Sequence, residues 1–178
     1  MNKILKLGLI LFLVCAIVAG VLGVVNEFTY QKIADYKAEK TAQAFAAVLK
    51  SDGYEEVAIN KKDDVFEMID GVYKASNGAG YVVQTTFSGA QGSITMVVGV
   101  DNDMKCTGIS IISHSETSGL GANAASNAEI GVNFRNSFKG QDASINVKSI
   151  DALSGATITS RSCANAAAGA INAVAALR

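Results

Sequence analysis

The chain of 178 residues carries 15 basic and 16 acidic side chains, a formal net charge of −1, with no basic stripe, which argues against a nucleic-acid partner. Its three cysteines and single histidine lack CxxC or CxxxC spacing, so no zinc or iron–sulfur site is predicted, and pairing of Cys106 with Cys163 stays open. The chain contains no proline, and the roughly 150 residues after an apolar N-terminus suit one compact domain.

The N-terminus is predicted to be a membrane anchor. Residues 7–25 carry no charge, and about 20 apolar residues in a helix cross the hydrocarbon core, so residues 1–25 are expected to form a transmembrane helix in the lipid bilayer. Two lysines precede the run and the first charge after it is Glu27, which predicts a cytoplasmic N-terminus and an extracytoplasmic main domain. The alternative is a cleaved signal peptide with its site at 21–23, although the apolar run is long for one.

Residues 26–50 are predicted to form a helix that leads away from the membrane. Apolar side chains such as Ile33, Tyr36 and Phe45 recur at roughly helical spacing. The sequence Ser51-Asp52-Gly53 is expected to end this helix. Mixed lysine and glutamate on the other face indicate a solvated surface.

Residues 56–113 have the pattern of an antiparallel meander with one buried face. Asn77-Gly78 is a strong hairpin-turn dipeptide between two apolar runs. Asp101-Asn102-Asp103 is interpreted as another turn, because the glycine and distal glutamate of an EF-hand calcium loop do not follow it. The expected strands are 72–75, 81–86, 93–100 and 107–113.

The C-terminal third is expected to add helices to this sheet. We predict a short helix over 124–138, a further short strand at 145–147, and an alanine-rich helix over 160–177. The fold class is therefore α+β, an antiparallel sheet packed with helices, plus one N-terminal transmembrane helix.

One run near the C-terminus, residues 151–160, contains the sequence Ser154-Gly155-Ala156-Thr157. A threonine hydroxyl is a poor nucleophile at neutral pH, and Asp151 is too distant in sequence to serve as its base. If Thr157 is modified, a separate transferase is implied, and the small neighbours Gly155 and Ala156 leave its approach open.

The predicted helix would place a phosphate on Thr157 just before a helix N-terminus, where free N–H groups and the helix dipole stabilise an anion. Thr159 and Ser160 are candidate N-caps and phosphate donors. The simpler alternative is that Ser154–Thr157 is only a turn with a cap.

A second motif, the loop from His114 to Gly121, has the sequence HSETSGLG. Its glycines allow a flat ligand to approach the backbone closely. Glu116 and Thr117 are able to hydrogen-bond the polar edge of such a ligand, and Leu120 to cover its apolar part. His114 is the single histidine of the chain, and a lone histidine is more often a structural residue than a ligand.

Taken together, the two motifs resemble those of the G subunit of the Rnf electron-transport complex, and they are similar to those of the related C subunit of the sodium-pumping quinone reductase. The resemblance covers nearly the whole chain, including Gly92 and the run Val98-Gly99-Val100-Asp101. It implies that residues 51–178 are an FMN-binding domain. It also implies that Thr157 carries FMN through a phosphoester installed by a magnesium-dependent flavin transferase that uses FAD, with Asp151 opening the recognition motif.

The remaining cofactor contacts implied by the resemblance lie in the two motifs. They are His114, Glu116, Thr117, Gly119, Leu120, Gly121, Asp151, Ser154, Gly155, Ala156, Thr159 and Ser160. Ser118 stands where the family loop normally has proline, which frees one backbone N–H and loosens the loop.

The function implied is that of a flavoprotein electron carrier in a redox-driven ion translocase of the inner cell membrane, which couples ferredoxin and NAD redox chemistry to Na⁺ or H⁺ transport. The expected partners are the other membrane subunits and the flavin transferase, and neither a catalytic residue nor a metal site is assigned to this chain. The alternatives are a stand-alone or sensory extracytoplasmic FMN-binding protein, and a non-redox anchored binding domain.

Overall fold

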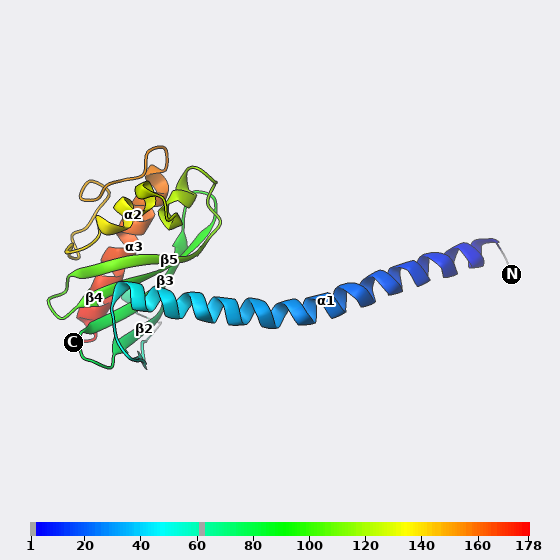
Figure 1. The fold of residues 1–178 in the computed structure, drawn as a ribbon, viewed down its shortest axis with the longest axis horizontal. Coiled ribbons are helices and arrows are strands. Elements are labelled where there is room, and N and C mark those ends of the chain that lie inside the picture. Colours follow the sequence, from blue (N-terminus) through cyan, green and yellow to red (C-terminus); the bar gives the residue numbers. More distant parts are fainter. Residues whose placement is uncertain (1–2, 61–62) are drawn as a thin grey trace. The chain divides into compact units, whose positions relative to one another are not determined.

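The computed structural model describes residues 3–60 and 63–178, and the chain divides into two compact units, Met1–Lys40 and Thr41–Arg178. The helix α1 (Lys3–Val48) begins in the first unit and ends in the second (Figure 1). It is continuous through the stretch predicted as a second helix. An 18-residue window of α1 has a mean hydropathy of 2.9, and none of its residues is buried against the rest of the described chain. The helix α1 is therefore long and apolar enough to cross a membrane.

The second unit is built on a five-stranded antiparallel sheet with the order β1-β2-β3-β4-β5, which confirms the predicted meander. The strands are β1 (Tyr54–Val57), β2 (Ile69–Ala75), β3 (Gly80–Ser88), β4 (Ser93–Asp101) and β5 (Cys106–His114), with a short 3₁₀ helix η1 (Asp64–Phe66) before β2. The predicted turn at Asn77-Gly78 joins β2 to β3: the Asn77 side chain accepts a hydrogen bond from Ala79 N, and Gly78 has a φ of +70°. The predicted turn after Asp101 is also present, and the Asp101 carboxylate accepts hydrogen bonds from two backbone N–H groups there.

Both faces of this sheet are buried, whereas the sequence pattern had predicted one. Neighbouring residues of a strand point to opposite faces. Val83 and Val98 belong to one apolar cluster and Val82 and Val97 to another, and all four are fully buried. A layer therefore covers the sheet on each side.

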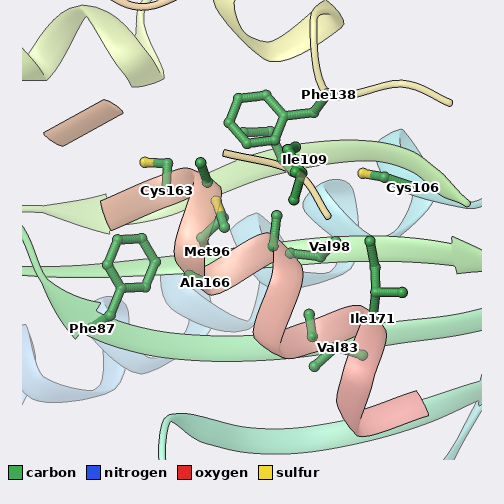
Figure 2. Close-up of a cluster of buried hydrophobic side chains, with 14 of the residues drawn as sticks. Val83, Phe87, Met96, Val98, Cys106, Ile109, Phe138, Cys163, Ala166 and Ile171 are labelled. Carbon is green, nitrogen blue, oxygen red and sulfur yellow. The ribbon is translucent and has the colours of Figure 1, made fainter. Parts of the chain in front are cut away.

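The first layer is the helix α3 (Thr157–Ala176), which lies across the sheet (Figure 1). Ile171 and Ala166 of α3 face Val83, Met96 and Val98 of the strands (Figure 2). Alanine is frequent on the buried side of α3, and its small side chain allows the helix backbone to lie close to the sheet. This packing fixes the position of the helix N-terminus, where Thr157 lies.

The second layer comes from the end of α1 within the same unit. Phe45 is buried there, with its ring centroid 5.2 Å from that of Tyr54 and 4.9 Å from that of Tyr73. Two hydroxyls hold the end of this helix. Thr107 donates a hydrogen bond to Val48 O at 2.5 Å, and Tyr54 donates one to Leu49 O. Ile33 and Tyr36 of the predicted stripe are exposed, so only the last turns of α1 contribute to this core.

Two predicted elements differ from the structure. The helix expected over 124–138 is a 3₁₀ turn, η2 (Gly121–Ala125), followed by the shorter α2 (Glu129–Asn136). The two are separated because Arg135 donates to the carbonyls of residues 124 and 126, while the Ser126 hydroxyl accepts from Ala128 N.

The strand expected at 145–147 is absent from the described part of the chain. The side chains of Asp142 and Asn146 each accept a hydrogen bond from the backbone two residues later, which closes local turns. At the beginning of β5, the backbone of residues 140 and 141 already pairs with Cys106.

Cys106 and Cys163 are both buried and do not form a disulfide. Figure 2 shows their sulfur atoms well apart, with Met96 and Ile109 between them. Burial raises the pKa of each thiol to about 12.

Candidate cofactor site

Thr157 is the first residue of α3, so the helix begins three residues earlier than predicted. The prediction that Thr159 and Ser160 are N-caps is wrong, because both lie inside the first turn. The residue at the N-cap position is Ala156, which has no side-chain group that caps the helix. Thr157 itself is exposed.

The first turn of α3 therefore has free hydrogen-bond donors. Within the described part of the chain, no group accepts from the backbone N–H of Thr157, Ile158 or Thr159. The first such bond of the helix is from Ser160 N to Ala156 O, at 3.0 Å. Unpaired N–H groups and the positive end of the helix dipole together favour a bound anion at this position.

Buried and exposed residues alternate along the segment 153–160. Leu153, Ala156 and Ser160 are buried, whereas Ser154 and Gly155 are exposed between them. The Ser160 hydroxyl donates to Ala156 O and accepts from Leu153 N, both at 3.0 Å. One buried hydroxyl thus closes the segment 153–156 onto the start of the helix.

The two sequence motifs meet at Thr159. Thr159 is buried, with 1% of the residue exposed. Its hydroxyl donates a hydrogen bond to Glu116 Oε2 at 2.6 Å. Next to this contact a Cβ on Gly121 would lie 2.2 Å from Glu116 Oε2 and 2.6 Å from Thr159 Oγ1. Glycine at 121 is therefore required by the protein's own packing.

The second carboxylate oxygen of Glu116 reaches a third segment. Glu116 Oε1 accepts from Ala90 N at 2.8 Å and from Gln91 N at 3.1 Å, in the turn between β3 and β4. Burial raises the pKa of Glu116, but the hydrogen bonds from Thr159, Gln91 and Ala90 outweigh this effect, so the pKa is lowered overall. Both oxygens are occupied by protein donors, and contact with a flavin ring stays a prediction.

Every residue of the loop from His114 to Leu120 except Glu116 is exposed. Gly119 has a φ of +79°, a conformation that side-chain-bearing residues rarely adopt. Leu120, 45% exposed, lies near Gly155, where an added Cβ would be 3.1 Å from Leu120 Cδ2. Leu120 from one motif and Ile158, the neighbour of Thr157 in the other, are thus both exposed apolar side chains.

Two further predicted residues lie at the edges of this site. His114, exposed at the end of β5, accepts a hydrogen bond through Nδ1 from Glu116 N at 3.3 Å, which gives it a structural role in the turn. The side chain of Asp151 is exposed and no described group hydrogen-bonds to it. It is accessible to a partner that recognises the surface of the motif.

The part of the site that sequence reasoning missed is the β3–β4 turn. Gly89 and Gly92 flank it and close it through a hydrogen bond from Gly89 N to Gly92 O at 2.7 Å. The paired glycines predict a tight turn, but nothing local indicates that its N–H groups bind Glu116. Within residues 3–60 and 63–178, no three histidine, cysteine or acidic side chains are placed to hold a metal ion.

Comparison with known proteins identifies the family of this site. Residues 89–172 match the FMN-binding domain, a range that includes both motifs and the β3–β4 turn, and residues 1–48 match the RnfG N-terminal region. The G subunit of the ion-translocating oxidoreductase complex of Methanosarcina acetivorans is 30% identical over 190 residues, which cover 98% of this chain and 96% of that protein. The chain belongs to this family of G subunits. The resemblance predicted from the motifs is confirmed.

A second relative of this RnfG-family chain is the G subunit of the Na(+)-translocating ferredoxin:NAD(+) oxidoreductase complex of Acetobacterium woodii. It is 32% identical over 185 residues, covering 89% of this chain and 85% of that protein. A solved structure, the C subunit of the Na(+)-translocating NADH-quinone reductase from Parabacteroides distasonis, is 22% identical, with a TM-score of 0.44 over 67% of this chain and 68% of that one.

Proposed function

We propose that this chain is the electron-carrying subunit of a membrane-bound complex that couples electron transfer between ferredoxin and NAD to ion translocation, and that it carries FMN on Thr157 through a phosphoester. The observation that supports the attachment best is the exposed Thr157 hydroxyl at an uncapped helix N-terminus, inside the range that matches the FMN-binding domain. The relatives named for ion translocation and for ferredoxin:NAD(+) oxidoreduction support the coupling.

The residues present fit a flavin phosphate. The free N–H groups of the first turn are donors for phosphate oxygens, and Gly155 leaves the approach to Thr157 open. Leu120 and Ile158 offer apolar surface to the flavin ring on neighbouring segments. When bound, the flavin supplies the redox chemistry, and the protein supplies its place and orientation.

The attachment step balances as a transfer from FAD. The Thr157 oxygen bonds to the phosphorus of the FMN half, the phosphoanhydride bond breaks, and AMP leaves, while the hydroxyl proton passes to a base. No described acidic or basic side chain hydrogen-bonds to Thr157, so the base comes from the separate transferase. Exposed Asp151 is the proposed start of the surface that this enzyme recognises.

The same proposal assigns the rest of the chain. Residues 1–25 span the membrane, residues 26–50 lead away from it, and residues 51–178 form the FMN-binding domain on the extracytoplasmic side. Because residues 7–25 contain no ionisable side chain other than a thiol, we assign the ion path to other membrane subunits.

The test is the intact mass of the full chain produced together with the flavin transferase. We expect the wild type to gain the mass of one FMN less one water and to fluoresce as a flavin band after denaturing electrophoresis. Thr157→Ala abolishes both signals, and Thr157→Ser keeps part of them because the hydroxyl survives.

Three results would overturn the proposal. They are an unmodified wild-type chain beside an active transferase, a flavin that remains on Thr157→Ala, and the unfolding of Thr157→Ala in circular dichroism. The role in a complex is tested separately by co-purification, since a stand-alone or sensory protein would purify without other membrane subunits.

A further inference from the structure

Three segments that are distant in sequence converge on one side chain, the carboxylate of Glu116. Its Oε1 atom holds the β3–β4 turn through two backbone N–H groups, and its Oε2 atom holds α3 through the Thr159 hydroxyl. Glu116 is 9% exposed, so water competes little for these hydrogen bonds.

The surroundings of the carboxylate are shaped for it. A Cβ on Gly89 would lie 2.3 Å from Glu116 Oε1, and a Cβ on Gly121 would lie 2.2 Å from Glu116 Oε2. Both distances are far below van der Waals contact, so a side chain at either glycine would displace the carboxylate. Each carboxylate oxygen is thus confined by one glycine and by its hydrogen-bond donors.

We propose that Glu116 is a positioning residue that fixes the place and orientation of Thr157, and hence of the flavin; this inference rests on the proposed attachment at Thr157. Glu116 does not touch Thr157. It acts through Thr159, two residues further along the same helical turn, and it ties that turn to the loop and to the β3–β4 turn. Ser160 holds the other side of the turn through Leu153 N.

A carboxylate suits this role better than a neutral side chain. It accepts from three donors at once, and its negative charge lies near the positive end of the α3 dipole. A hydrogen bond to a charged group is also stronger than one between neutral groups. The turn that presents Thr157 is therefore held more rigidly than the helix alone would hold it.

The test compares Thr159→Val, which removes the hydroxyl at nearly constant volume, with Thr159→Ser, which keeps it. The matched control is Thr85→Val, because the Thr85 hydroxyl is also buried and makes a 2.6 Å hydrogen bond, to Met68 O, in the core. For each full-length variant we would measure the initial rate of flavin attachment by purified transferase with FAD and Mg²⁺. The fluorescence anisotropy of the attached flavin would be the second readout.

We expect Thr159→Val to be labelled about fivefold more slowly than the wild type, the factor that corresponds to one net hydrogen bond. Its attached flavin should show lower anisotropy, since the anchor is less firmly held. Thr159→Ser restores both values, and Thr85→Val leaves both unchanged while it lowers the melting temperature. If Thr159→Val does not fold, Glu116→Asp, whose carboxylate is one methylene shorter, takes its place.

The outcomes separate this inference from the proposed function. If the wild type takes up flavin and Thr159→Val matches its rate and anisotropy, the positioning role is overturned while the attachment stands. Equal losses in Thr159→Val and Thr85→Val also overturn it, because the effect then reports only stability. A wild type that takes no flavin overturns the proposed function and this inference with it.

Discussion

Ser160→Ala is expected to destabilise the domain by leaving one buried backbone N–H, that of Leu153, without a hydrogen-bond acceptor. The substitution removes the oxygen that accepts from Leu153 N, and Leu153 is only 3% exposed, so water does not replace the lost partner. Ala156 O keeps its bond from the backbone of residue 160 and loses only the second one. A buried N–H without an acceptor costs roughly 1–3 kcal/mol.

A partial gain opposes this loss. Alanine is the better helix former by roughly 0.5 kcal/mol, which leaves a net loss of about 1.5 kcal/mol. For a unit the size of residues 41–178, each kcal/mol lowers the melting temperature by about 3–4 °C, so we expect a decrease of about 5 °C.

The assay is thermal unfolding of the full-length chain in detergent micelles, followed by near-ultraviolet circular dichroism. Ser162→Ala is the control, because Ser162 is half-buried on the same helix and its hydroxyl makes no hydrogen bond to a described residue. It is expected to change the free energy of unfolding by less than about 0.5 kcal/mol. A Ser160→Ala chain that melts with the wild type would show that the closure of the segment 153–156 contributes nothing to stability.

Three further predictions concern other parts of the site and the core. Because the folded-state pKa of Glu116 is lowered from its ordinary value of 4.5, its contribution to stability is present above that pH and is lost as the pH falls below it. Glu116→Gln should therefore have a flatter stability profile than the wild type in urea unfolding between about pH 5 and pH 3; parallel profiles would refute this assignment. Gly155→Ala should cost about 1 kcal/mol, because φ is +72° there and the new methyl meets Leu120, and an unchanged urea midpoint would contradict that strain. Cys106 and Cys163, with thiol pKa values of about 12, should resist maleimide at pH 8 in the folded chain and react in guanidinium, as peptide mass mapping would reveal.

The sequence predicts those parts of the fold that depend on local chemistry. Asn77-Gly78 forms a turn because the Asn77 side chain and the glycine backbone suffice, and the apolar runs on both sides become β2 and β3. The apolar N-terminal run likewise predicts a membrane-spanning helix by composition alone, and the structure joins it to the helix predicted at 26–50.

Contacts between distant residues account for what the sequence did not predict. The run 145–147 has the residues of a strand, but the adjacent backbone is already held in turns by Asp142 and Asn146. Thr159 has the chemistry of an N-cap, yet its hydroxyl bonds to Glu116, which lies 43 residues earlier in the chain. No local pattern shows that such a partner exists.

The burial of both faces of the sheet also depends on contacts between residues that are distant in sequence. The antiparallel meander was predicted to have one buried face, although the consecutive apolar residues Met96-Val97-Val98 place apolar side chains on both faces. The second face is covered by the last turns of α1, where Phe45 contacts Tyr73, and the sequence assigned those turns to a helix without indicating where they dock.

The convergence on Glu116 has a consequence for biogenesis. Residues 90, 116 and 159 are far apart in the sequence, so the hydrogen bonds of Glu116 form only after the sheet has formed and α3 has packed on it. The arrangement that presents Thr157 therefore exists only in the folded domain. A modifying enzyme that prefers this arrangement would act late, on folded molecules. The proposed FMN phosphoester on Thr157 would then be present on folded copies, and misfolded copies would lack flavin.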